Sequence, residues 1–164
     1  MDPVNHIACI MLGSNIEPER NIRRAVALLQ QKLTVLRTSS VYESASVECC
    51  YPDYLNLALQ VETKLDASDL KQQLLRPMEA RMGRVRSEDK NAARTMDLDI
   101  ILFDGVVLDP TLWQHAHLAI PVSELFPDHL SETGEPLKVI AKRLAQMTPI
   151  QLRKDITIPS LSRD

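Results

Sequence analysis

Asp97 and Asp99 stand two residues apart at the head of the apolar run 97–103, and no other feature constrains the fold as strongly. A strand sends residues i and i+2 to the same face, so both carboxylates would share one face while Leu98 and Ile100 take the other. A helix would instead separate the two acids by about 200°. Two neighbouring carboxylates on a buried strand are costly unless a cation lies between them. The run therefore predicts a strand that carries a site for Mg²⁺, an ion that binds one or two carboxylates and completes its shell with phosphate oxygens.

A cationic segment directly precedes this strand. Residues 83–94 contain Arg84, Arg86, Lys90 and Arg94 but only two acidic side chains. Guanidinium groups hold phosphate oxygens in bidentate pairs, and metal ions bridge such oxygens. Taken separately, the segment could be a solvated loop and Asp97 a simple strand cap. Because both features occur within one short segment, we interpret them together as a polyphosphate site.

The chain as a whole has the length of a single domain, and we expect residues 1–164 to form one. The formal net charge of −3 argues against a general nucleic-acid binder. No apolar run reaches the roughly 18–20 residues that span a bilayer, and the N-terminal residues lack the basic region of a signal peptide. Cys9, Cys49 and Cys50 show no Cys-x-x-Cys spacing, which is typical of reduced thiols. We therefore expect a cytoplasmic protein that binds neither nucleic acid nor membranes.

Periodicity and turn signals divide the chain into alternating elements. Strands are predicted at 6–12, 34–42, 54–63 and 97–103, with a hairpin return at 106–108 after Asp104-Gly105. Helices are predicted at 15–32, 66–82 and 136–147, with a short one at 123–126, while 43–53 and 83–93 are loops and the last dozen residues a tail. Pro77 should kink the second helix or shift its boundary, and Gly83 should end it. This order predicts an α+β fold, a ferredoxin-like α/β sandwich with a central, mainly antiparallel sheet and a small C-terminal hairpin and helix.

Five motifs in order give the chain a resemblance to a known family. The string Arg94-x-x-Asp97-Leu98-Asp99-Ile100-Ile101 resembles the signature of the 6-hydroxymethyl-7,8-dihydropterin pyrophosphokinases, enzymes of folate synthesis. The other four are Gly13-Ser14-Asn15, Pro52-Asp53-Tyr54-Leu55-Asn56, Glu79 and Gly83-Arg84-Val85-Arg86. Each is a weak signal by itself, but five at compatible spacing are specific, and they extend over most of the chain.

The resemblance implies an ATP-dependent pyrophosphokinase, in which the hydroxymethyl oxygen of the pterin attacks the β-phosphorus of ATP and AMP leaves. It implies that Asp97 and Asp99 hold two Mg²⁺ ions in this reaction. It further implies that Arg84 and Arg94 take part in catalysis and clamp the triphosphate. Other contacts with ATP are implied for Glu79, Arg86, Ile100 and His115.

The resemblance also implies a pocket for the pterin. Tyr54 would flank the flat ring, and Asn56 would bind its amide edge through its own donor and acceptor. Both side chains lie on the same face of the predicted strand 54–63, which supports this interpretation independently. Ser44 and Val47 would line the pocket, and His117 would stand near the position of an aromatic ring that stacks on the pterin. A solvent-facing strand surface is the alternative explanation for Tyr54 and Asn56.

The sequence departs from the family pattern in the segments that should close the site. Asn91 replaces an aromatic residue of the loop, and the stretch after His115 is shortened and lacks an arginine. The hairpin after Gly105 is also short and lacks a basic residue. We therefore expect weaker closure and slower turnover. His115 and His117 could form a strand-borne zinc pair, although no third ligand is obvious.

Two alternatives to the pyrophosphokinase stay open. The first is a divergent paralogue that uses an altered pterin or has low activity. The second is a non-catalytic ferredoxin-like binding module whose acid pair is structural. For the pyrophosphokinase itself, we expect ATP and the pterin as small-molecule partners and a monomeric protein.

Overall fold

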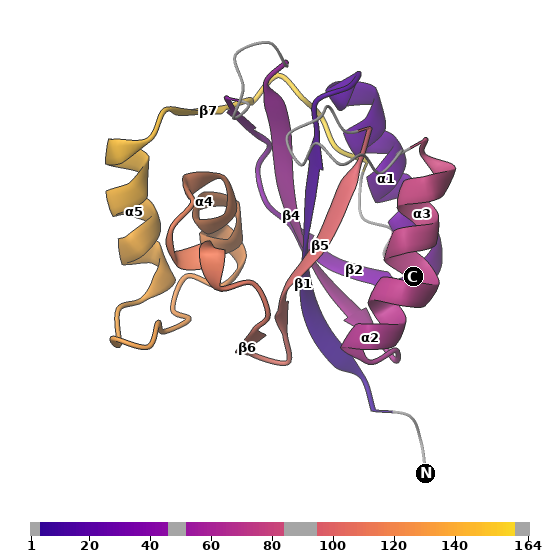
Figure 1. Cartoon of the computed structure of the whole chain (residues 1–164), viewed down its shortest axis with the longest axis horizontal. Coiled ribbons are helices and arrows are strands. Elements are labelled where there is room, and N and C mark those ends of the chain that lie inside the picture. Colours follow the sequence, from indigo (N-terminus) through magenta and orange to yellow (C-terminus); the bar gives the residue numbers. More distant parts are fainter. Residues whose placement is uncertain (1–3, 46–51, 84–94, 160–164) are drawn as a thin grey trace, which may run out of the picture.

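A central sheet carries helices on both of its faces (Figure 1). The computed structural model describes residues 4–45, 52–83 and 95–159. Its strands are β1 (His6–Ser14), β2 (Thr34–Thr38), β3 (Tyr42–Ser44), β4 (Tyr54–Thr63), β5 (Asp97–Phe103), β6 (Val106–Val107) and β7 (Ile150–Leu152). Its helices are α1 (Pro18–Lys32), α2 (Ala67–Asp69), the π-helical turn η1 (Leu70–Leu75), α3 (Arg76–Arg81), the 3-10 turn η2 (Pro110–Trp113), α4 (Ala116–Leu125) and α5 (Leu137–Met147). None of these helices is long and apolar enough to cross a membrane.

The sheet is antiparallel at every strand pair within the described ranges. Its strands follow the order β6-β5-β1-β4-β3-β7, and β2 also pairs with β4. The long central strands β1 and β4 pair from His6↔Thr63 to Ser14↔Leu55, and β5 joins the other edge of β1. The predicted α+β, ferredoxin-like arrangement with a mainly antiparallel sheet is confirmed.

Two hydrophobic cores lie on opposite faces of this sheet. Helix α1 and the α2–α3 segment cover one face, and α4 and α5 cover the other (Figure 1). Ile10 and Leu12 of β1 belong to the first core, whereas Cys9 and Met11 belong to the second. Because both faces are covered, β1 is a continuous apolar run without polar alternation.

A β-bulge interrupts the alternation of β5 beyond the acid pair. Opposite β1, the register shifts between Cys9↔Leu102 and Ile10↔Ile100, which leaves Ile101 as the extra residue. Ile101 and Leu102 consequently both pack into the second core, while Leu98 lies in the first. The predicted alternation holds from Asp97 to Ile100, so the two carboxylates share one face.

The backbone confirms the predicted hairpin turn and the predicted end of the second helix, whereas the helix predicted at 15–32 begins only at Pro18 because β1 continues to Ser14. Asp104 and Gly105 have φ values of 48° and 80°, the left-handed pair that a tight I′ hairpin requires. Gly83 has φ 89° directly after α3, which is typical of a helix C-terminus. Pro77 has no N–H to donate, and it lies in the first turn of α3 after the π-helical turn η1.

The predicted strand 34–42 is wrong in its extent, because the chain forms two short strands there. Between β2 and β3, the Ser39 N–H donates to the Ala58 carbonyl at 2.8 Å, and Ser39 Oγ accepts from the Ala58 N–H at 2.9 Å. A serine side chain thus replaces one bond of the β-ladder. The chain leaves the ladder at Ser39 and returns to β4 at Tyr42.

The predicted helix 123–126 is also wrong, since α4 begins at Ala116. This helix is buried against both the sheet and α5, so it lacks the polar stripe by which a surface helix is found. Pro121 lies inside the helix. The expected tail over the last dozen residues is wrong for the part that the structure describes, because the Arg153 N–H donates to the Val41 carbonyl and Ile156 is buried in the first core. Strand β7, which the sequence did not predict, pairs with β3 just before this segment.

Candidate active site

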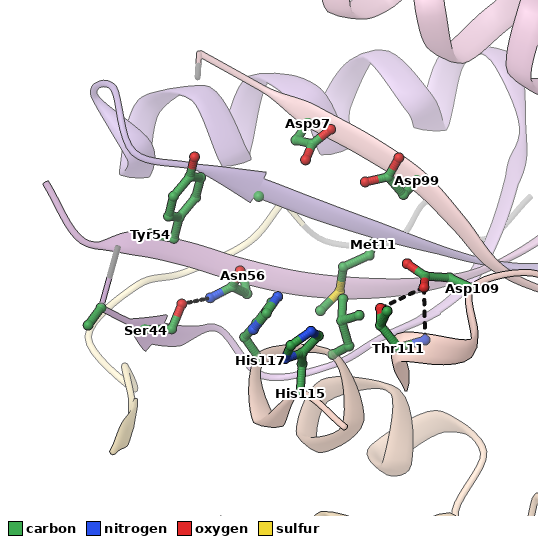
Figure 2. Close-up of a pocket in the computed structure, with 13 residues that line it drawn as sticks. Met11, Ser44, Tyr54, Asn56, Asp97, Asp99, Asp109, Thr111, His115 and His117 are labelled. Carbon is green, nitrogen blue, oxygen red and sulfur yellow. Dashed lines mark hydrogen bonds between the residues drawn. The ribbon is translucent and has the colours of Figure 1, made fainter. Parts of the chain in front are cut away.

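A cavity of about 460 Å³ opens between β5, β4 and the N-terminus of α4 (Figure 2). Backbone register places the three strands around it. Gly13 of β1 pairs with Asn56 of β4 on one side and with Asp97 of β5 on the other. The cavity is lined by Met11, Gly13, Ser44, Ala45, Tyr54, Asn56, Asp97, Asp99, Asp109, Thr111, His115, His117 and Leu118.

The two aspartates lie side by side along one wall of this cavity (Figure 2). Asp99 lies opposite Met11 and Asp97 opposite Gly13, so their spacing is fixed by the β-ladder. The Asp99 side chain is 45% exposed, so its oxygens can reach a cation. Among the described residues no three histidine, cysteine or acidic side chains come together as a metal site. Two carboxylates on one strand face form a donor set that fits Mg²⁺, whose remaining ligands would be phosphate or water oxygens.

Asn56 presents an amide to the cavity from the opposite side of β1. It is 4% exposed, and its Nδ2 donates to Ser44 Oγ at 2.8 Å and to the Tyr42 carbonyl at 3.4 Å. Both donor hydrogens are thereby directed toward β3. A Cβ on Gly13 would lie 3.7 Å from Asn56 Oδ1. This acceptor therefore faces the space that is left free because Gly13 has no side chain.

His115 and His117 close the cavity from the N-terminus of α4, and not from a strand as expected. His115 is the N-cap residue and His117 lies in the first turn, with ring centroids 5.3 Å apart. Burial, together with the nearby His115, lowers the pKa of His117 to about 4. His117 is therefore a neutral ring at physiological pH. The proposed zinc pair finds no support among the residues that the structure describes.

Glu79 lies beneath β5 and is not among the residues that line the cavity. Its side chain is 2% exposed and accepts hydrogen bonds from the Leu98 N–H at 3.0 Å and from Arg76 at 2.6 Å. A contact between Glu79 and ATP stays a prediction. The observed contacts instead tie α3 to the strand segment between Asp97 and Asp99.

A second hollow of about 500 Å³ lies against the same strand, on the side of η1 and α3. Ile100 and Arg76 line it, and it shares Asp99 and Asp109 with the first cavity. The structure thus places Ile100 beside the acid pair but outside the cavity that contains Asn56. Val47, Arg84, Arg86 and Arg94, which the sequence also nominates, lie outside the described residues.

Several residues of the site escaped the sequence-based prediction. Asp109 accepts from the Thr111 N–H at 3.0 Å and from Thr111 Oγ1 at 2.6 Å, and thereby caps η2 at the cavity wall. An Asp-Pro-Thr sequence is a recognisable cap, but it does not reveal which cavity it faces. Arg76 was missed too, although its spacing of three from Glu79 in a predicted helix is a signal for an ion pair.

The chain is similar to known proteins in sequence and in fold. A family model described as 7,8-dihydro-6-hydroxymethylpterin-pyrophosphokinase matches residues 9–127, which is more than half of the chain. A 2-amino-4-hydroxy-6-hydroxymethyldihydropteridine pyrophosphokinase of Haemophilus influenzae is 28% identical over 157 residues, covering 88% of this chain and 97% of that protein. A protein of the same name from Pseudomonas putida is 35% identical over 105 residues, covering 62% of this chain and 86% of its own length.

Longer proteins match as well. A folic acid synthesis protein of Dictyostelium discoideum is 28% identical over 79% of this chain, but the chain spans only 21% of that protein. A crystal structure of Plasmodium falciparum HPPK-DHPS superimposes with a TM-score of 0.71 at 10% sequence identity, covering 88% of this chain and 46% of that one. This second likeness concerns the fold alone.

Proposed function

This chain belongs to the 7,8-dihydro-6-hydroxymethylpterin-pyrophosphokinase family, and we propose that it transfers pyrophosphate from ATP to 6-hydroxymethyl-7,8-dihydropterin in folate synthesis. One observation carries the proposal: Asn56 and the acid pair border the same cavity from opposite sides of β1. Two strand spacings separate Asn56 from Asp97, which is about 10 Å. A flat ring held at Asn56 can therefore extend its substituent toward Asp97.

The pterin is bound by groups that the fold holds rigid. The bonds from Asn56 Nδ2 to Ser44 and Tyr42 fix the amide, so Asn56 Oδ1 accepts an N–H from the edge of the ring. Gly13 leaves room for the flat ring, and Tyr54 covers it from the same strand as Asn56. The neutral ring of His117 lies on the side of α4.

The acid pair holds the phosphates beside the hydroxymethyl group. In the reaction the hydroxymethyl oxygen forms a bond to the β-phosphorus, the bond from that phosphorus to the α-phosphate oxygen breaks, AMP leaves, and the hydroxyl proton is released. Mg²⁺ at Asp97 and Asp99 would supply charge neutralisation for both oxygens of this displacement, with two ions as the number we propose. The carboxylates fix its place, because β-pairing with Gly13 and Met11 holds their backbone.

The nucleotide extends along β5 from this point. Ile100 and the second hollow continue from Asp99, and His115 stands at the cavity rim, which supports ATP as the co-substrate. We include Arg84, Arg86 and Arg94 as phosphate ligands and Val47 as a pterin contact on the strength of the sequence motifs alone. We also propose that residues 1–164 form a single domain and that the protein is a monomer. We propose a cytoplasmic location, which the cysteine pattern suggests, and partners limited to these small molecules.

The deciding experiment measures AMP formation from ATP and Mg²⁺, with and without 6-hydroxymethyl-7,8-dihydropterin. We expect pterin-dependent AMP from the wild type and at least a 100-fold loss in Asp99→Ala, because removing a metal ligand removes most of the charge stabilisation. Asp128→Ala is the matched control, since Asp128 is 80% exposed and pairs with Lys138 outside the residues that line the cavity. Equal rates in Asp99→Ala and wild type would refute the metal site.

The same assay separates the alternatives. A paralogue with an altered substrate would bind ATP analogues in the presence of Mg²⁺ but form little AMP with the standard pterin. A binding module would show no Mg²⁺-dependent affinity for ATP analogues. Slow but pterin-dependent turnover would match the shortened segments around the site.

A further inference from the structure

Arg76 connects Asp99 of the acid pair to the buried carboxylate of Glu79. It is the first residue of α3, and its side chain is 26% exposed. One guanidinium nitrogen lies 2.6 Å from Glu79 Oε1, and another lies 3.9 Å from Asp99 Oδ1. A single planar fork of donors thus contacts one carboxylate in the core and one in the cavity.

Glu79 keeps this guanidinium in place. Its carboxylate is almost fully buried, and its second oxygen accepts from the Leu98 N–H at 3.0 Å. Removing the positive partner of a buried carboxylate is strongly destabilising, so Arg76 is held to Glu79 whether or not a ligand is present. The position of its charge beside Asp99 is therefore a fixed property of the fold.

We propose that Arg76 is a positioning residue that holds Asp99 toward α3 and sets the affinity of the acid pair for its cation. A fixed positive charge about 6 Å from a divalent ion repels that ion, even in water-like surroundings. After screening by salt, this repulsion weakens cation binding roughly 3- to 10-fold. Cation binding is thereby kept weak until phosphate oxygens bring additional negative charge. The inference rests on the proposed function, because it takes Asp97 and Asp99 as the cation ligands.

The first test measures the dissociation constant of Mn²⁺ alone by electron paramagnetic resonance. Arg76→Gln removes the charge but retains a donor for Glu79, so Mn²⁺ should bind 3- to 10-fold more tightly than to the wild type. Arg76→Lys keeps the charge and should stay within twofold of the wild type. Arg81→Gln, which removes an exposed charge from the same helix, is the matched control and should also stay within twofold. Unchanged or weaker binding in Arg76→Gln would overturn the inference.

A second test needs no metal. Thermal unfolding in EDTA is compared for Arg76→Gln, Asp99→Asn and the double variant, which form a double-mutant cycle. If the two side chains contact each other, their effects should not be additive. The shift in melting temperature of the double variant should then differ from the sum of the two single shifts by at least about 1 °C. Additive shifts would overturn the inference. If the wild type binds no Mn²⁺ at all, the metal site of the proposed function fails, and this cycle still decides whether Arg76 positions Asp99.

Discussion

At the scale of single residues, Gly13 leaves the floor of the cavity open between Asn56 and Asp97. A Cβ built at this position would meet Asn56 Oδ1 at 3.7 Å and a Tyr54 ring carbon at 3.8 Å, which are ordinary van der Waals distances. Its φ also lies outside the left-handed region that strains a side chain. We therefore expect the absence of a side chain at Gly13 to matter more for the volume of the pocket than for folding.

Gly13→Ala tests this distinction. We expect the melting temperature to change by less than about 2 °C, since the methyl group fits, while the KM for the pterin rises at least fivefold because the methyl occupies the ring's space. The KM for ATP should stay within twofold, and Gly13→Val should enlarge the effect on the pterin. Calorimetric unfolding and steady-state kinetics measure the two quantities. An unchanged pterin KM in both variants would show that the ring binds elsewhere.

His117 links the site to the pH dependence of stability. Its pKa of about 4 in the folded protein lies below the ordinary value of 6.5, so the unfolded chain binds the proton more readily. The stabilisation is fully present above pH 6.5 and is lost as the pH falls toward 4. We expect the free energy of unfolding to drop by about 1–3 kcal/mol over this interval.

Chemical denaturation of the wild type and of His117→Gln between pH 7 and 4 measures this contribution. The variant lacks the titrating ring, so its stability should fall less over the interval by the same amount. His129→Gln serves as a control because His129 is not among the residues that line the cavity. Parallel pH profiles for the wild type and His117→Gln would contradict the prediction.

At the scale of elements, the C-terminal segment supports the strand that carries Ser44. Strand β7 pairs with β3, and the Arg153 N–H donates to the Val41 carbonyl at 2.9 Å. The Arg153 side chain contacts Glu43 at 3.2 Å and Glu19 of α1 at 3.3 Å. The segment therefore ties β3 to α1, although it is distant in sequence from the site.

Removing residues 148–164 should loosen β3 as well as expose the core around Ile156. We expect the melting temperature to fall by about 5–10 °C, which corresponds to a few kcal/mol in a chain of this size. The KM for the pterin should rise more than that for ATP, because Ser44 holds the Asn56 amide. Arg153→Met is a milder variant that should shift both quantities in the same direction. If the truncated chain binds pterin like the wild type, β7 does not support the pocket.

At the scale of the whole molecule, the two cores share the same central strands. Ile10 and Leu12 pack on one face of β1, and Cys9 and Met11 pack on the other. Unfolding of either core would therefore disrupt the strand on which the other core packs. This arrangement favours one cooperative unit over residues 1–164.

Thermal unfolding should consequently be a single transition. Far-UV circular dichroism reports the helices of both layers, and the fluorescence of Trp113 reports the second core against which it packs. The two probes should give the same midpoint within about 1 °C. Two separated midpoints would show that α4 and α5 unfold independently and would refute the single-domain proposal.

Features that depend on local chemistry could be predicted from the order of the amino acids. The alternation of β4 and β5 placed Tyr54 with Asn56 and Asp97 with Asp99, because the two-residue period of a strand needs no tertiary information. Asp104-Gly105 determined the hairpin turn for the same reason, since few residues adopt the left-handed conformation easily. The ordered motifs identified the family.

Features that depend on packing between distant segments became known from the folded structure. Helix α4 is mostly apolar because the sheet and α5 both cover it, so periodicity could not locate its start and misplaced His115 and His117 on a strand. The pairing of β7 with β3 joins segments more than a hundred residues apart. The contact of Arg76 with Asp99 likewise requires α3 to dock on β5. Such contacts form between surfaces that are brought together by folding. The local sequence of either segment does not show which other segment it will contact.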